Sequence, residues 1–251
     1  NMRSHGHGQG YLDINFLIPE IVERIDYTKG PYHAEKGDFA SAGSISFTTK
    51  SKLAHPLAEI EVGSFGHVRG LLAGSGEAAG GTVLAALEGT VSDGPYALGE
   101  RLRKVNGLIK YSRDNWSLSF SGYHTNYRAT DQVPVRAIQS GLIPRLGFID
   151  GDLGGRVSRV AANFNGDFDG TKVSAYAIGY RFKLTSNFTY FLDDPVNGDE
   201  FQQRDGRGIF GGAISREFPA TLFGAQTKLR VGVATRFDRI GKVGLSRRVR
   251  G

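Results

Sequence analysis

The residues of this chain that could do chemistry are histidines, acidic side chains and one glycine motif. His5 and His7 would share one face of a strand and could chelate a metal ion, but no third ligand accompanies them. The stretch from Gly206 to Gly211 matches the GxGxxG spacing. Charged residues precede it and an alternating stretch follows it, whereas a dinucleotide fold needs a strand before the motif and a helix after it. Neither pattern predicts a cofactor site.

Acidic residues gather in three stretches that could offer oxygen ligands to calcium. These stretches are Asp150 with Asp152, Asp167 to Asp169, and Asp193-Asp194 with Asp199-Glu200. Hydrated acids in loops explain them more simply, so we predict no metal site and no cofactor. The chain also has no Walker A, HExxH or GxSxG pattern, and we expect it not to be an enzyme.

Composition narrows the class of protein that must position these residues. The chain has 251 residues, with 36 glycines, 16 phenylalanines, 10 tyrosines, no cysteine and a net charge of +6. A disulfide scaffold is excluded, and no apolar run reaches the roughly 18 residues of a membrane-spanning helix. The arginines at 247–250 lack interleaved aromatic residues, so we predict no nucleic-acid partner. Aromatic and glycine-rich short stretches favour β structure.

Two regions differ in their periodicity. Residues 11–50 mix a short helical turn from Pro19 to Arg24 with strands over 25–28 and 44–49. From Leu57 onward, apolar residues alternate with small or polar ones, as in Tyr176, Ile178 and Tyr180. We therefore expect nine further strands, at 57–65, 67–76, 82–92, 102–113, 115–128, 156–168, 171–192, 206–218 and 226–238.

Strand length and loop length favour a membrane barrel over a soluble β-sandwich. The strand expected to end at Leu192 has about 21 residues, whereas soluble strands usually have about 3–10. Short turns at Asp114-Asn115, Asp169-Gly170 and Pro219–Ala225 alternate with long connections at 129–155 and 193–205. Sorting of short turns and long loops is typical of a transmembrane antiparallel β-barrel. Phe, Tyr, Leu and Val should then face lipid, with Ser, Thr, Lys, Arg and Gly inward.

Residues 8–50 carry a series of motifs in order. They read GQGYLD at 8–13, FLIPE at 16–20, VERIDYTKGP at 22–31, GDFASAG at 37–43 and ISFTTK at 45–50. This series resembles the end of the plug domain of TonB-dependent outer-membrane receptors, where a PxxVERIExxxGP segment and a glycine-rich loop lead to a final strand. The chain departs from the family in its longer loop at 32–39 and in Lys29, where the family often has arginine.

The resemblance implies a domain division and a set of structural residues. Residues 1–52 would be the C-terminal part of the plug, and 53–251 the N-terminal part of a transmembrane barrel, about nine of its 22 strands. The chain would then be a fragment. The plug loop motif would comprise Gly30, Pro31, Gly37 and Gly43. Candidates for a plug–barrel lock are Arg24, Lys29 and Glu23, with Glu59, Glu61, Glu88 and Glu217 as possible barrel partners.

The resemblance also implies a function. It is ligand-gated, energy-coupled import of a scarce nutrient, siderophore-iron first among them, across the outer membrane of a Gram-negative bacterium. Partners would be a TonB-type energy-coupling complex, outer-membrane lipid or lipopolysaccharide, and a small-molecule ligand. Loop position suggests Arg136, Arg145, Asp150, Tyr190 and Asp194 as ligand contacts. The alternatives are a passive porin-like channel and a soluble β-rich carbohydrate-binding protein.

Overall fold

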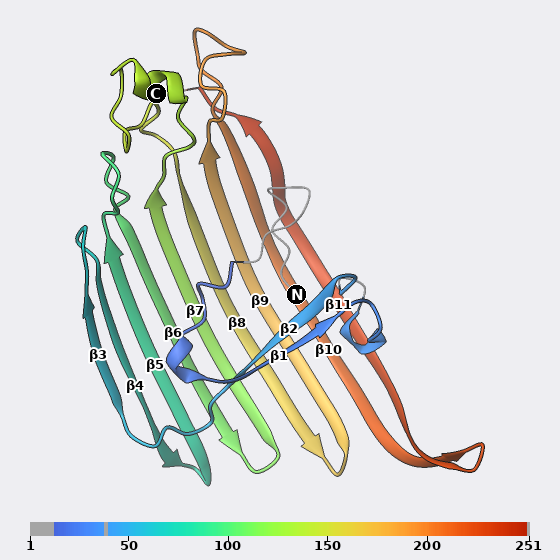
Figure 1. Ribbon diagram of the computed structural model, residues 1–251. Coiled ribbons are helices and arrows are strands. Elements are labelled where there is room, and N and C mark those ends of the chain that lie inside the picture. The colour runs from blue at the N-terminus through green and yellow to red at the C-terminus, as the bar shows by residue number, and fades with distance from the viewer. Residues whose placement is uncertain (1–12, 38–39, 250–251) are drawn as a thin grey trace.

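The structure is a computed structural model that describes residues 13–37 and 40–249, and it is mainly antiparallel β (Figure 1). A two-stranded hairpin comprises β1 (Val22–Lys29) and β2 (Gly43–Thr49). The other strands form one nine-stranded sheet. They are β3 (Leu57–Val62), β4 (Val68–Ala78), β5 (Gly81–Ser92), β6 (Leu102–Arg113), β7 (Trp116–Arg128), β8 (Gly154–Phe168), β9 (Thr171–Ser186), β10 (Phe201–Leu222) and β11 (Ala225–Arg247).

Each strand of the large sheet pairs with its neighbours in sequence, so the sheet is a simple meander. The prediction of nine strands after Leu57 is confirmed. Helical structure among the described residues is limited to three short pieces, η1 (Pro19–Ile21), η2 (Ala34–Lys36) and α1 (Val135–Gln139). The helical turn expected from Pro19 to Arg24 is shorter than predicted, because strand β1 already begins at Val22 and pairs with Thr49.

Tight turns lie at one end of the sheet and the longer connections at the other, as the sequence predicts (Figure 1). Three of the tight turns have positive φ at both central residues, in Ala79-Gly80, Asp169-Gly170 and Phe223-Gly224. Positive φ at both positions is the type I′ geometry, whose twist matches that of the flanking strands. The opposite end carries the connections 129–153 and 187–200. We call this the loop end.

Four predicted strand ends were wrong by four residues or more, among them the end of β11, which lies at Arg247 instead of residue 238. Strand β9 ends at Ser186 instead of Leu192, because Asn187 begins a turn in which its Oδ1 accepts a hydrogen bond from the Tyr190 amide at 2.7 Å. Strand β10 begins at Phe201 instead of residue 206. It continues past Pro219 to Leu222, where a two-residue turn leads into β11. The longest strands are therefore β10, with 22 residues, and β11, with 23.

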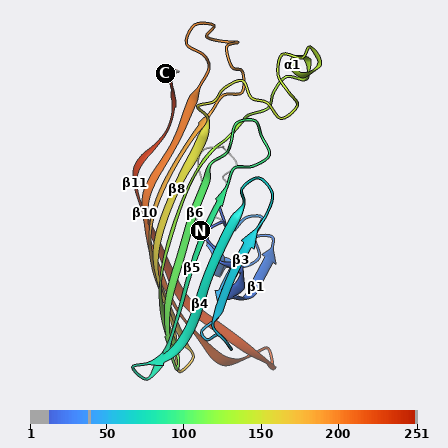
Figure 2. The same cartoon turned by 90° about the vertical axis from the view of Figure 1, so that its left-hand side faces the viewer.

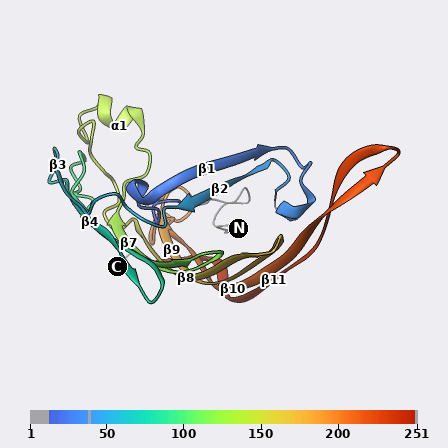
Figure 3. The ribbon, with the colours of Figure 1, turned by 90° about the horizontal axis from the view of Figure 1, so that it is seen from below.

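The large sheet is curved, and its concave side faces the N-terminal hairpin (Figures 2 and 3). Residues 13–52, which include β1 and β2, are called the covering segment below. The sheet is open: β3 and β11 form its two edges, and neither has a second partner strand among the described residues. Within the described part of the chain, no helix is long and apolar enough to cross a membrane.

The orientation of β9 differs from the expectation that large apolar residues face outward. Tyr180 is buried in a cluster with Tyr123 and Val157, against which Phe16 of the covering segment packs. Its outward neighbours in the strand are small or basic, such as Gly179 and Arg181. Alternation shows which residues share a face, but the covering segment decides that the larger side chains of β9 lie on the concave face.

Candidate functional site

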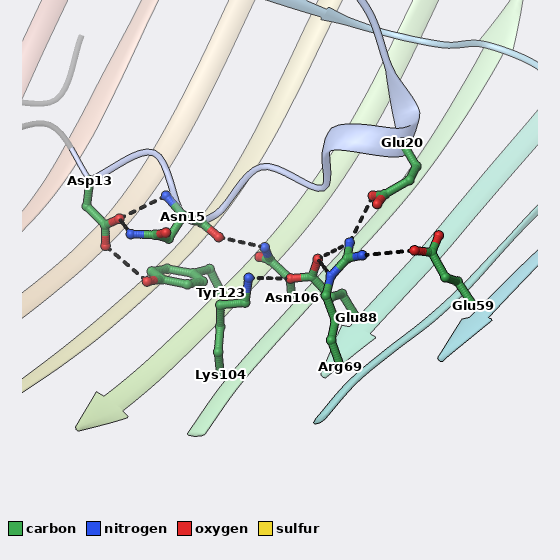
Figure 4. Close-up of polar contacts among 9 residues, drawn as sticks. All are labelled: Asp13, Asn15, Glu20, Glu59, Arg69, Glu88, Lys104, Asn106 and Tyr123. Atoms are coloured by element: carbon green, nitrogen blue, oxygen red, sulfur yellow. Dashed lines mark hydrogen bonds and ion pairs between the residues drawn. The ribbon is translucent and has the colours of Figure 1, made fainter. Parts of the chain in front are cut away.

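An ion cluster joins the covering segment to the concave face of the sheet (Figure 4). Arg69 of β4 contacts Glu20 of η1 at 2.9 Å and Glu88 of β5 at 2.6 Å, and its Nη1 lies 3.8 Å from Glu59 of β3. Lys104 of β6 contacts the second oxygen of Glu88 at 2.6 Å. The Glu88 side chain is only 1% exposed. Two cations therefore face three carboxylates, one of which belongs to the covering segment.

Two further hydrogen bonds extend this contact along the sheet (Figure 4). The Tyr123 hydroxyl donates to Asp13 Oδ2 at 3.0 Å, and Asn106 Nδ2 donates to the Asn15 carbonyl at 2.8 Å. Asn106 is buried, so its amide would carry a desolvation cost without this partner. These bonds fix the register of residues 13–15 on β6 and β7.

Apolar side chains also hold the covering segment on the sheet. Ile18 and Ile21 are buried in one cluster with Leu71 of β4 and Leu84 of β5. Phe16 lies 4.1 Å below the guanidinium of Arg159, a cation–π arrangement on the concave face. Burial of each large apolar side chain contributes about 1.5–3 kcal/mol. The stretch 13–21 is therefore the firmly held part of the covering segment.

Further on, the covering segment is attached by isolated polar contacts. Lys110 Nζ donates to the Thr49 carbonyl at 2.7 Å, and Lys52 Nζ lies 3.4 Å from Glu77 Oε1 in an exposed ion pair. Directly after the segment, Ser75 Oγ accepts from the Leu53 amide at 2.8 Å. In the hairpin itself, most side chains are exposed, including Ile25 and Tyr27.

The predicted lock residues lie on this exposed hairpin. Arg24 pairs with Asp26 of its own strand at 2.8 Å, and its side chain is 67% exposed. Glu23 and Lys29 are also exposed. The ion pair on the concave face uses Glu20 instead, a residue predicted only to lie in a helical turn. Of the possible partners in the sheet, Glu59 and Glu88 belong to the ion cluster, whereas Glu61 pairs with His67 and Glu217 with Arg230.

The glycines of the predicted loop motif have conformational roles. Gly30 and Gly37 have φ of 75° and 78°, in the left-handed region that favours glycine. Gly43 begins β2 with φ of 147°, and a side chain there would collide with the Thr28 carbonyl. Pro31 follows Gly30 in the loop between β1 and β2. Asp38 and Phe39 of this loop lie outside the described residues, as do the motif residues 8–12 and both His5 and His7.

At the loop end, the two long connections are joined by buried polar contacts. Asn187 Nδ2 donates to Asp150 Oδ2 at 2.9 Å, and the Asn187 amide donates to Asp131 at 2.7 Å. The Tyr190 hydroxyl donates to the Gln132 carbonyl at 2.7 Å. Burial raises the pKa of Asp131 above its ordinary value. Asp150 and Tyr190 thus belong to the framework between the loops.

The other three predicted ligand contacts lie outside this framework. Arg136 on α1 and Arg145 are exposed. Asp194 accepts hydrogen bonds from the amides of Val196 and Asn197 and so stabilises a turn, which lowers its pKa. The structure therefore brings Asp150 and Tyr190 close together, and it leaves the other three outside that framework.

Three acids meet beside this framework. The ligand oxygens of Asp150, Asp152 and Glu200 lie within 4.8 Å of one another. Burial, with the carboxyl of Asp150 next to it, raises the pKa of Glu200. In the sequence these residues stand in two separate stretches. They meet because the β7–β8 and β9–β10 connections lie next to each other at the loop end. The other acids behave as expected of turns: Asp167 accepts from the Gly170 amide at 3.1 Å.

The convex face has a different chemistry from the concave one. Large apolar side chains remain exposed there, including Leu72, Leu87, Phe120, Val160 and Phe210. Near the tight turns, the rings of Tyr111, Trp116 and Phe164 follow one another with centroids 5.3 and 6.0 Å apart.

Toward the loop end, the convex face carries a row of basic residues, called the basic row below. Cross-strand pairing places Arg103 of β6 next to Asn126, Asn126 next to Arg156, Arg156 next to Lys183, and Lys183 next to Arg204 of β10. A cavity of about 540 Å³ opens beside Arg103, Arg156 and Lys183. Like charges directly opposite each other in a sheet are destabilising, so this row favours an anionic counterpart.

The GxGxxG stretch lies wholly within β10, where Gly206–Gly211 pairs with both β9 and β11. It therefore has no helix N-terminus to bind a phosphate, as the sequence analysis expected. Comparison of the chain with protein-family models and with curated proteins gave no match.

Proposed function

We propose that this chain forms part of the wall of an outer-membrane transport barrel, with the covering segment as part of the plug that closes its lumen. The observation that carries the proposal is the contrast between the two sheet faces. Away from the basic row, the convex face exposes large apolar side chains that no described residue covers. The concave face combines Asn106, Lys110 and Ser119 with buried apolar side chains, and it receives the covering segment. A soluble sheet would bury its apolar face, but a barrel wall turns it to lipid.

Two further features of the convex face support a membrane orientation. The aromatic group Tyr111, Trp116 and Phe164 lies near the tight turns, as expected of a belt at the membrane–water interface. The basic row lies toward the loop end and suits phosphate-bearing lipid, such as lipopolysaccharide. The long loops would then face the cell exterior and the tight turns the periplasm of a Gram-negative bacterium.

The ion cluster suits a plug that is held but can be released. When Glu20 moves away, Arg69 keeps Glu88 and Glu59 as partners, and Lys104 keeps Glu88. Release therefore leaves no buried charge without a partner, which would cost about 3–5 kcal/mol. A force supplied by a TonB-type energy-coupling complex would need to break the Glu20–Arg69 ion pair, the hydrogen bonds made by Asp13, Asn15 and Thr49, and the apolar contacts of residues 16–21.

The transported ligand in this proposal is a scarce nutrient, with siderophore-bound iron as the first candidate. It would bind at the loop end, where Arg136 and Arg145 are exposed and Tyr190 lies in the framework between the loops. The proposal assigns no enzymatic step to the chain.

The test is cross-linking of the covering segment in the intact protein that carries this chain. Because the chain has no cysteine, Glu20→Cys and Arg69→Cys together can be joined by a short, reducible bis-thiol reagent. Cells would be supplied with a ferric catecholate and a ferric hydroxamate siderophore, each labelled with radioactive iron. We expect the cross-link to stop uptake and a reductant to restore it, with both single variants unaffected by the reagent.

Two outcomes would contradict this function. Uptake that continues with the cross-link in place would show that the covering segment need not move. Uptake that persists after an uncoupler collapses the inner-membrane potential would favour a passive channel.

A further inference from the structure

The acidic group at the loop end contains a side chain whose burial is not matched by hydrogen bonds. The Glu200 side chain is 0% exposed, and neither of its carboxylate oxygens has a hydrogen-bond partner. Its neighbouring cation is Arg248, whose Nη1 lies 3.7 Å from Oε2, too far for a hydrogen bond. A buried carboxylate without donors is costly unless a charge of opposite sign compensates it.

The carboxyls around Glu200 add to this excess of negative charge. Oxygens of Asp150, Asp152 and Glu200 all lie within 4.8 Å of one another. Asp150 is buried, and its position is fixed by donors from Asn187 at 2.9 Å and from the Asp152 amide at 3.0 Å. Each carboxylate oxygen has two lone pairs, so Asp150 can accept these bonds and still bind an ion. Asp131 also lies close enough to Asp150 for the two charges to interact.

We propose that Asp150, Asp152 and Glu200 bind one calcium ion, which joins the 129–153 loop to the start of β10. Calcium binds oxygen at about 2.4 Å, so two ligands of one ion lie up to about 4.8 Å apart. The three carboxylates meet this limit without rearrangement. Magnesium demands near-ideal octahedral geometry at about 2.1 Å and gives up its water reluctantly, so three carboxylates from two loops suit calcium better.

The site is also accessible and suitably tethered. Asp152 is exposed while Asp150 and Glu200 are buried, so the ion can enter past Asp152 and lose water at the buried pair. Asp150 and Asp152 come from the connection between β7 and β8, and Glu200 directly precedes β10. Binding would therefore hold together two connections that are far apart in sequence.

The experiment is calcium titration of the full chain in detergent micelles at about pH 7.5 in chelator-treated buffer. Isothermal calorimetry would give the affinity, with magnesium titrated in parallel. Glu200→Gln keeps the shape of the side chain and removes its charge, and we expect it to weaken calcium binding at least about tenfold. Asp169→Asn, in a tight turn at the other end of the sheet, makes the same change in charge and should leave the affinity unchanged.

Arg248→Gln provides a test in the opposite direction. Removing the neighbouring guanidinium should tighten calcium binding, because the ion would no longer be repelled by that charge. As a second readout, calcium should raise the unfolding temperature of the unaltered chain and not that of the Glu200→Gln variant.

Three outcomes would overturn the proposal. The first is a chain that binds no calcium in the titration. The second is an affinity that neither Glu200→Gln nor Arg248→Gln changes, which would place the ion elsewhere. The third is magnesium binding as tight as calcium binding, which would contradict the assignment of calcium to the site.

Discussion

At the scale of single residues, Glu200 and Glu20 show how burial determines what a carboxylate does. Glu20 has a guanidinium at 2.9 Å and serves as a contact between two parts of the chain. Glu200 is fully buried without a hydrogen bond, next to a second acid. The first arrangement stabilises the ionised form, and the second opposes it.

The protonation of Glu200 yields a prediction about stability and pH. Its pKa is raised in the folded chain, so its contribution to stability is fully present below the ordinary pKa of glutamate and is lost as pH rises through the raised value. In calcium-free buffer near neutral pH, Glu200→Gln should therefore raise the free energy of unfolding by about 1–2 kcal/mol. Thermal unfolding in detergent at several pH values measures this.

The difference in stability between the unaltered chain and the Glu200→Gln variant should disappear in acid, because Glu200 is then protonated. The charged groups near Glu200 are Asp150, Asp152 and Arg248, with Asp131 close to Asp150. Asp169 is remote from all of them, so the Asp169→Asn variant serves as a reference for general acid effects. A variant less stable than the unaltered chain at neutral pH would show that the Arg248 contact outweighs the cost of burial.

The ion cluster yields a second prediction at this scale. Arg69→Met should destabilise the chain by about 3–5 kcal/mol, because it leaves buried Glu88 with Lys104 alone. Glu20→Gln should cost about 1 kcal/mol or less, since Arg69 keeps its partners in the sheet. Thermal unfolding in detergent compares the two variants.

Arg113→Met is the control, because the contact of Arg113 with Asp114 is exposed. An equal loss of stability in the Arg69→Met and Glu20→Gln variants would refute this account of the cluster.

At the scale of elements, the strands of the sheet place rows of chemically different residues at different distances from the loop end. One row on the convex face runs from β4 to β8 through Leu72, Leu87, Gly107, Gly122 and Val160, and the basic row lies nearer the loop end. Residues opposite each other in an antiparallel sheet are close neighbours, so the charges of Arg156 and Lys183 in the basic row lie side by side.

The basic row gives the prediction that belongs to this scale. Arg156→Gln combined with Lys183→Gln should at least halve the lipopolysaccharide retained by the purified chain in detergent, since these neighbouring charges would bind its phosphates. Mass spectrometry of the bound lipid measures the retained amount. Arg113→Gln with Arg216→Gln removes the same charge near the tight turns and should have little effect. Equal losses from both pairs would mean that net charge alone attracts the lipid.

At the scale of the whole molecule, the open sheet combines an uncovered apolar face with two unpaired edges. Strands β3 and β11 each present unsatisfied backbone groups on one side within the described structure. Exposed apolar surface and free strand edges both promote association.

We therefore predict that the isolated chain aggregates in plain buffer and disperses only with detergent or lipid. Size-exclusion chromatography with light scattering measures this, and in detergent the gel mobility should change on heating. A monodisperse folded monomer in plain buffer would exclude the membrane assignment and favour a soluble β-rich protein.

The sequence by itself determined the local features of this molecule. The nine strands and the tight turn at Asp169-Gly170 follow from period-two alternation and turn residues, which act over a few neighbouring positions. The separation of long loops from tight turns follows as well, because consecutive antiparallel strands must reverse at alternate ends. The end of β9 was missed, since the side chain of Asn187 competes there with the strand pattern.

Only the tertiary structure decided which groups meet. Alternation is symmetric between the two faces, so the direction of Tyr180 depends on where the covering segment packs. Glu20 rather than Arg24 contacts the sheet because residues 13–21 lie on its concave face while the hairpin strands remain exposed. Asp150 and Glu200 are far apart in sequence, and they become neighbours because two successive connections reverse at the same end of the sheet.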